Sequence, residues 1–366
     1  MSQRDKPPFR ADHVGSLLRP RSLLELREGW RQGEVTSDEL REVEDEAVRE
    51  AVALQAAAGL QGITDGEFRR DWWHLDFLAG FEGIELAYET AAPSFASGER
   101  PPVTKVVGKV RHGHGIFTEP FKFLAAATSG TAKLTIPGPA LYHLRPGRAG
   151  IDASIYPDLD RFWDDVVVAY RAEIQALYDL GLRYLQIDDV SFAYLCDATM
   201  RNSLEARGDD PDATCALYVD LINRVIADRP PDLVVTTHMC RGNFKSSWVA
   251  QGGYEAVAEA VFGGLKVDGL FLEYDSDRAG GFEPLRFVRP ETLVVVGLIT
   301  SKTPELEDPD RIVRRLDEAS RHVPLDRLCL SPQCGFSSTY HGNALTADDQ
   351  RRKLDLTVAL SQRVWG

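Results

Sequence analysis

The chain has 366 residues, of which 43% are hydrophobic and 27% charged, so it has the composition of a globular protein with a sizeable core. Its formal net charge of −14 at pH 7 excludes a basic footprint for nucleic acid or for an anionic membrane. No stretch approaches about 18 uninterrupted apolar residues, and the N-terminus lacks an apolar signal core, so we expect a cytoplasmic protein without a membrane partner.

Short apolar runs of β type alternate with longer segments of helical periodicity along the chain. The eight predicted strands are residues 9–13, 62–64, 133–136, 184–187, 233–237, 269–272, 293–296 and 328–330. The predicted helices are residues 37–58, 159–180, 212–227, 253–262, 309–323 and 346–364.

This alternation predicts a parallel sheet, and eight such units predict a closed (β/α)8 TIM barrel rather than an open α/β sheet. We expect one catalytic domain over residues 1–366. Residues from about 86 to 127 break the rhythm and hold proline, glycine and alternating valines, so we expect an inserted hairpin or lid after the second strand.

Chemically reactive side chains follow the predicted strands. They are Ser16, Asp65, Glu67, Asp188, Asp189, His238, Cys240, Glu273, Lys302 and Cys334. In a TIM barrel these positions share the face on which active sites are built.

A set of four of these residues has the chemistry of a zinc site. His238 and Cys240 are two residues apart at a strand end, so their side chains point to the same side. Glu273 ends the next strand, and Cys334 follows the last one, flanked by Pro332 and Gly335. Mixed sulfur, nitrogen and oxygen ligands suit zinc, and thiolates disfavour magnesium or calcium. Zinc would deprotonate a bound substrate thiol, which is the form that attacks an alkyl donor.

The five cysteines are sparse and odd in number, so they do not form a disulfide framework. We expect Cys196, Cys215 and Cys329 to be core residues. A lone His-X-Cys pair on an apolar strand is usually core as well, so the zinc hypothesis depends on the shared barrel face.

Several segments resemble the catalytic domain of cobalamin-independent methionine synthase, and most closely its short single-barrel relatives. They are residues 10–20 (RADHVGSLLRP), 63–69 (ITDGEFR), 186–188 (QID), 237–240 (THMC) and 330–336 (LSPQCGF). The resemblance covers nearly the whole chain and implies that His238, Cys240, Glu273 and Cys334 bind zinc. It also implies that Ser16, Glu67 and Asp188 contact homocysteine, with the two acidic residues holding its amino group. A carboxylate pair at a barrel mouth suits an ammonium ion, although such residues also often cap helices.

The alkyl-donor half of the resemblance is altered. Lys302 stands where the full-length enzymes have a proton-delivering histidine, and the tryptophan that stacks on folate is missing beyond the third strand. His143, Arg145 and Arg148 could form a local cationic patch for an anionic donor. We therefore predict that Lys302 faces the pocket and contacts the donor, and we take Lys302 and Asp188 as the candidate catalytic residues. The alternative is a surface lysine paired with Glu305 or Glu307.

The leading hypothesis is a methyltransferase that makes methionine from homocysteine, with a folate or another methyl carrier as donor. A runner-up on the same scaffold joins an epoxide to coenzyme M, whose sulfonate would need arginines such as Arg19, Arg69 or Arg241 in the pocket. A third possibility is a zinc- or thiol-binding protein without turnover. A metal-free porphyrinogen decarboxylase type of barrel would have no use for the His-X-Cys pair. The sequence is compatible with a homo-oligomer without specifying one.

Overall fold

The computed structural model describes residues 4–87 and 102–366, and its centre is a curled parallel sheet of seven strands. The strands are β1 (Gly62–Ile63), β4 (Thr131–Pro137), β5 (Tyr184–Asp189), β6 (Val234–Met239), β7 (Gly269–Glu273), β8 (Leu293–Ile299) and β9 (Leu328–Pro332). They pair in chain order, each strand parallel to the next. Each of these strands coincides with a predicted one to within a few residues.

The segment before β1 closes the sheet into a barrel. Leu330 of β9 donates its N–H to the Arg10 carbonyl at 2.9 Å, and its own carbonyl accepts from Asp12 N at 3.0 Å. On the other side, Leu17 N donates to the Gly66 carbonyl at 3.1 Å. The predicted first strand at residues 9–13 is thus reduced to a single bridge at Ala11. This segment lies between β9 and β1 and completes the ring of eight strand positions. The fold is the predicted TIM barrel.

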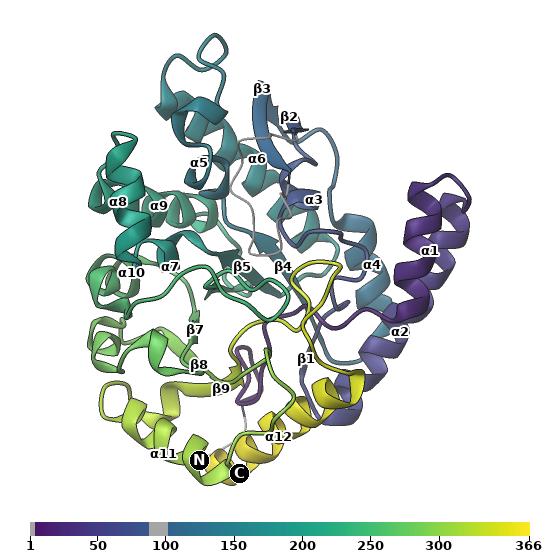
Figure 1. The fold of residues 1–366 in the computed structure, drawn as a ribbon, viewed down its shortest axis with the longest axis vertical. Helices are drawn as coiled ribbons and strands as arrows, with labels where there is room; N and C mark the ends of the chain where they lie inside the picture. Colours follow the sequence, from purple (N-terminus) through teal and green to yellow (C-terminus); the bar gives the residue numbers. More distant parts are fainter. Residues whose placement is uncertain (1–3, 88–101) are drawn as a thin grey trace.

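Figure 1 shows the helices as an outer ring around the strands. They are α1 (Arg21–Arg31), α2 (Ser37–Ala58), α3 (Leu75–Leu78), α4 (Thr118–Ala127), α5 (Leu141–Leu144), α6 (Leu159–Asp179), α7 (Ser191–Tyr194), α8 (Ala198–Ala206), α9 (Pro211–Ile226), α10 (Ala258–Gly264), α11 (Pro309–Ser320) and α12 (Ala347–Trp365). Five 3-10 turns complete the described elements: η1 (Gly147–Gly150), η2 (Tyr254–Ala256), η3 (Asp277–Ala279), η4 (Glu283–Phe287) and η5 (Leu325–Arg327). None of the helices in the described ranges is long and apolar enough to cross a bilayer.

Local sequence sets the ends of the long helices. Thr36 and Glu39 form a capping box at the start of α2, and Gly59 ends that helix in the left-handed conformation at φ 89°. A second capping box, between Thr346 and Asp349, starts α12. The two helices pack against each other, so the first and last long helices of the ring meet.

The segment that interrupts the alternation contains two different elements. The antiparallel strands β2 (Glu82–Ala87) and β3 (Val103–Arg111) pair as the expected hairpin arms, while residues 88–101 lie outside the described part of the chain. The last ten residues of the segment instead form α4, which packs between α2 and α6 as the helix that links β1 to β4. Phe121 and Leu124 are its buried residues.

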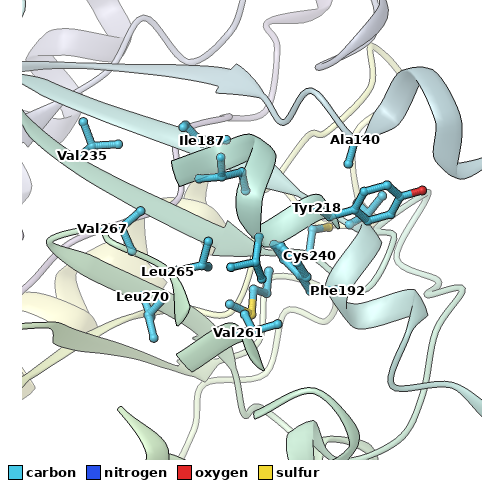
Figure 2. Packing of buried hydrophobic residues seen from close by; sticks show 14 of the residues in the cluster. Ala140, Ile187, Phe192, Tyr218, Val235, Cys240, Val261, Leu265, Val267 and Leu270 are labelled. Atoms are coloured by element: carbon cyan, nitrogen blue, oxygen red, sulfur yellow. The ribbon is translucent and has the colours of Figure 1, made fainter. Parts of the chain in front are cut away.

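The main core lies between the strands and the helix ring. Figure 2 shows Ile187, Val235 and Leu270 of β5, β6 and β7 packed in one buried cluster with Tyr218 and Val261 of α9 and α10. Residues that alternate with these point into the barrel, as the two-residue period of a strand requires.

The barrel interior combines apolar and polar layers. Its apolar part is a small cluster of Val14, Phe271, Val295 and Cys329. Beside it, the buried ammonium of Lys133 lies 3.0 Å from Asp12 Oδ1, and the hydroxyl of Tyr184 donates to Asp12 Oδ2 at 2.8 Å. Beyond this layer, the polar residues of the barrel lie at the carboxyl ends of the strands.

Candidate metal and thiol site

The four predicted ligands meet where β6, β7 and β9 end. Donor atoms of His238, Glu273 and Cys334 all lie within 4.8 Å of one another, and His238 Nε2 is 3.7 Å from Glu273 Oε1. The Cys240 sulfur lies 3.6 Å from the Cys334 sulfur. All four side chains are buried.

The separation of the two sulfurs fits a tetrahedral zinc ion, while Cys240 lies outside the set whose donors are all within 4.8 Å of one another. Two sulfurs bound to one zinc at about 2.3 Å lie about 3.8 Å apart in tetrahedral geometry. The observed 3.6 Å between Cys240 and Cys334 is close to that spacing. The described residues therefore contain a possible His/Glu/Cys metal site with the second cysteine beside it.

Neighbouring groups orient the cluster. Asp188 is the register partner of His238 across β5 and β6, and its Oδ1 lies 3.1 Å from His238 Nδ1. The Nε2 of the same ring faces the cluster and lies 3.2 Å from the Gln333 carbonyl. The backbone N–H of Gly242 donates to the Cys240 sulfur at 3.3 Å, and that of Arg241 donates to Glu273 Oε1 at 3.0 Å.

Burial and close charges shift the pKa values of the cluster. Burial alone would lower the pKa of His238, but the hydrogen bond and the negative charge of Asp188 raise it to about 9. The hydrogen bond between the sulfurs lowers the pKa of Cys240 and raises that of Cys334, so the pair shares a proton. Burial would raise the pKa of Glu273, but the positive charge of Lys302, followed by His238, lowers it.

Glu67 faces the same cavity with one free oxygen. Its Oε1 accepts a hydrogen bond from Thr135 Oγ1 at 2.7 Å and lies 3.6 Å from Arg70, whereas the buried Oε2 has no hydrogen-bond partner. Burial raises the pKa of Glu67, and the charge of Asp188 raises it further. The backbone of Glu67 is in the left-handed region at φ 61°, a conformation that costs energy outside glycine and is often found at functional sites.

Ser16 lies between the loops that carry Glu67 and Cys334. Its carbonyl accepts from Phe336 N at 2.9 Å, and its Oγ accepts from Ser337 N at 3.4 Å. A Cβ on Gly335 would lie 1.9 Å from Ser16 Oγ, so only glycine allows this approach. The serine thus lines the cavity and holds the loop that carries Cys334, while the next residue, Leu17, donates to Gly66 in the loop that carries Glu67.

One small cavity is lined by most of these groups, and Glu273 lies outside its lining. It is lined by Val14, Ser16, Glu67, Trp73, Asp188, His238, Cys240, Cys334, Gly335 and Ser338. Its volume of about 20 Å³ is close to what one water molecule needs. Trp73 and Ser338 are its half-buried lining residues outside the predicted set. No motif in the sequence marks either residue, although each lies within a few positions of Glu67 or Cys334.

Lys302 is buried rather than exposed on the surface. Its side chain is 6% exposed, and its charge acts on both Glu273 and Cys334. The surface-pair alternative does not hold, because Glu307 pairs with Lys353 at 3.3 Å and the carbonyl of Glu305 also accepts from Lys353.

The other candidate residues serve the scaffold. Asp189 Oδ1 accepts from Ser191 N at 2.6 Å and also from the Ser191 hydroxyl, at the start of the short α7. In the expected cationic patch, His143 pairs with the Tyr218 hydroxyl at 2.9 Å, and Arg148 donates to the carbonyls of residues 151 and 156. These groups are therefore engaged in packing near α5 and η1.

A TIM barrel whose strand ends gather two thiols, an imidazole and three carboxylates has the features of an enzyme with its active site on this face. The chain matches the family model "Cobalamin-independent synthase, Catalytic domain" over residues 10–353. It therefore belongs to the cobalamin-independent methionine synthase family, and it is an enzyme of the methyltransferase type.

Similar proteins cover the whole chain. The uncharacterized protein YxjH of Bacillus subtilis is 46% identical over 98% of this chain and 96% of its own length. A Listeria monocytogenes structure described as a candidate vitamin-B12-independent methionine synthase is 40% identical, covers 99% of this chain and 100% of that one, and has a TM-score of 0.80. A B12-independent methionine synthase from Shewanella sp. W3-18-1, in complex with selenomethionine, shares the fold at 21% identity and a TM-score of 0.74, covering 97% of each chain.

Proposed function

We propose that this protein is a zinc-dependent thiol alkyltransferase that methylates homocysteine, or a closely similar amino-acid thiol, to give methionine. The observation that carries the proposal is the composition of one cavity. His238, Cys240 and Cys334 line one wall, with Glu273 within 4.8 Å of the donors of His238 and Cys334, and the carboxylates of Glu67 and Asp188 line another. A molecule with a thiol at one end and an ammonium group at the other matches both walls.

The four donors are the groups that would hold the metal. Zinc bound there lowers the pKa of a coordinated thiol so that the nucleophilic thiolate forms at neutral pH. Asp188 fixes the ring of His238 through Nδ1 and keeps Nε2 aimed at the cluster. Two backbone N–H groups hold further metal-ligand atoms in place. The N–H of Arg241 donates to the Glu273 carboxylate, and the N–H of Gly242 donates to the sulfur of Cys240.

The free oxygen of Glu67 supports an acceptor with an amino group. A buried carboxylate oxygen without a partner is costly, and an ammonium donor would satisfy it. Thr135 already holds the other oxygen, so the carboxylate is oriented before the substrate binds. The Shewanella structure is a complex with selenomethionine, an analogue of the proposed product.

The arginines that a coenzyme M sulfonate would need are engaged elsewhere. Arg19 donates to backbone carbonyls, Arg69 pairs with Glu44 and with an aspartate of α2, and Arg241 donates to the Gly252 carbonyl at 2.7 Å. None of the three is among the described residues that line the cavity. The epoxide reaction therefore has less support than methyl transfer to an amino-acid thiol.

Metal analysis tests the ligand set. We expect about one zinc per chain in the wild type, as for a four-ligand site, and almost none in a Cys240→Ala, Cys334→Ala double variant. Cys215→Ala is the matched control, because Cys215 is a buried cysteine of α9 outside the cluster, and it should keep its zinc. Full zinc retention in the double variant would overturn the assignment.

A donor screen tests the reaction. Zinc-loaded protein is incubated with homocysteine and methyltetrahydrofolate or other methylated carriers, and separately with coenzyme M and an epoxide, and products are followed by mass spectrometry. Methionine formation supports the proposal. A product only from coenzyme M would favour the epoxide reaction. If no donor gives a product, the third hypothesis, a thiol-binding protein without turnover, would be favoured.

A further inference from the structure

Arg19 has an unusual set of partners for a residue outside the cavity. It follows Ser16 by three positions, is 7% exposed, and directs its guanidinium into the interior. Its Nη1 donates to the Ser337 carbonyl at 3.0 Å, to Ser337 Oγ at 2.8 Å and to the Thr339 carbonyl at 3.1 Å. Its Nη2 donates to the carbonyls of Glu67 and Arg70 at 2.8 and 2.7 Å.

One planar group therefore joins two loops. Ser337 and Thr339 belong to the loop after β9, and Glu67 and Arg70 to the loop after β1. Because the guanidinium is a rigid planar group, its hydrogen bonds hold the two loops together and also set the distance between them. Lysine carries the same charge but cannot reproduce the fork.

The two loops hold opposite ends of the cavity. Cys334 precedes Ser337 by three residues, and Glu67 itself accepts one of the Arg19 bonds through its carbonyl. The distance from the metal-ligand side to the free oxygen of Glu67 thus depends on how far apart Arg19 holds the loops.

We propose that Arg19 is a positioning residue that sets the length of the amino-acid thiol accepted by the site. The inference rests on the proposed function, in which sulfur lies at the metal ligands and the ammonium group at Glu67. Homocysteine and cysteine differ by one methylene between these groups, and only one of them spans a fixed gap. One methylene in a well-fitted site is worth about 10- to 200-fold in discrimination.

Arg27 provides a matched control. It is also buried and also grips the loop after β1, donating to the Phe68 carbonyl at 2.6 Å and to the Arg70 carbonyl at 3.1 Å. Its remaining partners are Glu44 of α2 and Asp71. Loss of the Arg27 fork therefore loosens one loop without releasing the other.

The experiment compares zinc-loaded wild type, Arg19→Lys and Arg27→Lys. Zinc content, thermal unfolding, and the dissociation constants of homocysteine and cysteine are measured by metal analysis and calorimetry. We expect the wild type to prefer homocysteine. Arg19→Lys should keep its zinc while this preference falls at least tenfold, and Arg27→Lys should keep the preference to within about twofold of the wild type.

A milder variant covers the case in which Arg19→Lys does not fold. Ser337→Ala removes one Arg19 partner, and it should reduce the preference in the same direction by a smaller factor. If Arg19→Lys folds and its preference for homocysteine is unchanged, the inference is wrong but the proposed function stands. The same holds if Arg19→Lys fails to fold and the preference is unchanged in Ser337→Ala. An equal loss of preference in Arg27→Lys also overturns the inference and leaves the proposed function in place. A wild type without any preference for homocysteine overturns the inference and the proposed acceptor together.

Discussion

Asp188 and Glu67 line the same cavity, but their side chains have different partners. Asp188 Oδ1 accepts from Gln186 Nε2 at 2.8 Å and lies 3.1 Å from His238 Nδ1, so it serves the ligand histidine. Glu67 has no contact with His238 among the described hydrogen bonds and keeps Oε2 unpartnered. We therefore divide the roles that the family resemblance gives jointly to the two acids.

Exchanging each acid for its amide separates these roles. Asp188→Asn should lower zinc affinity about 10- to 100-fold, because the histidine loses its charged partner. Glu67→Gln should leave zinc affinity unchanged and weaken homocysteine binding by about 1.5–3 kcal/mol, the scale of a hydrogen bond to a charged group. Chelator competition and calorimetry measure the two effects. A thiol without an amino group is the control, and equal weakening of both thiols by Glu67→Gln would contradict the assignment.

At the scale of elements, the sequence predicts strands and long helices well where local signals mark their ends. Helix α2 spans the predicted residues 37–58, since a capping box and a left-handed glycine define both ends. The sequence pattern does not predict helix α4, because the helix is short, has Pro120 in its first turn and follows a stretch of hairpin character. The eighth strand position is a bridge at Ala11, a reduction that depends on tertiary pairing.

For the site, the sequence predicts which face of the barrel the proposed ligands share, but not the contacts that depend on strand register or on distant loops. Each proposed ligand follows a predicted strand, so the barrel alone brings His238, Glu273 and Cys334 to one face. The pairing of Asp188 with His238 depends on the register between β5 and β6, which one sequence does not encode in its local pattern. The bonds of Arg19 join loops that are far apart in sequence and could not be inferred from it.

The loop after β8 supplies Lys302, the residue that we connect with the alkyl donor. Lys302→Met removes the ammonium group while keeping most of the side-chain volume, so zinc content and thiol binding should stay near wild type. Alkyl transfer should fall at least tenfold, about 1.4 kcal/mol of barrier. Methyltetrahydrofolate should be a slow donor, since the stacking tryptophan and the relay histidine are both missing. Lys122→Met, at an exposed pair on α4, is the control. Rapid turnover with that folate, unaffected by Lys302→Met, would contradict this role.

At the scale of the whole molecule, the proposed ligands come from the part of the barrel between β6 and β9. A bound ion would link elements that are otherwise held by strand pairing and by the helix ring. Because the unfolded chain cannot present the four donors together, zinc binding adds to the free energy of unfolding. The expected gain is about 2.7 kcal/mol when free zinc exceeds its dissociation constant 100-fold.

This gain should depend on pH with a defined sign. In the metal-free protein the pKa of His238 is raised to about 9, so its proton competes with the metal below that pH. The raised pKa also means that the His238–Asp188 pair stabilises the metal-free fold below the unfolded value of about 6.5 and is lost as pH rises towards 9. Both effects act in the same direction. The difference in unfolding temperature between zinc-loaded and chelator-treated protein should widen from pH 6.5 to pH 9 at fixed free zinc, as measured by thermal unfolding. The Cys240→Ala, Cys334→Ala variant should show almost no difference at any pH, and a wild-type difference that stays constant or narrows would contradict the assigned ligands.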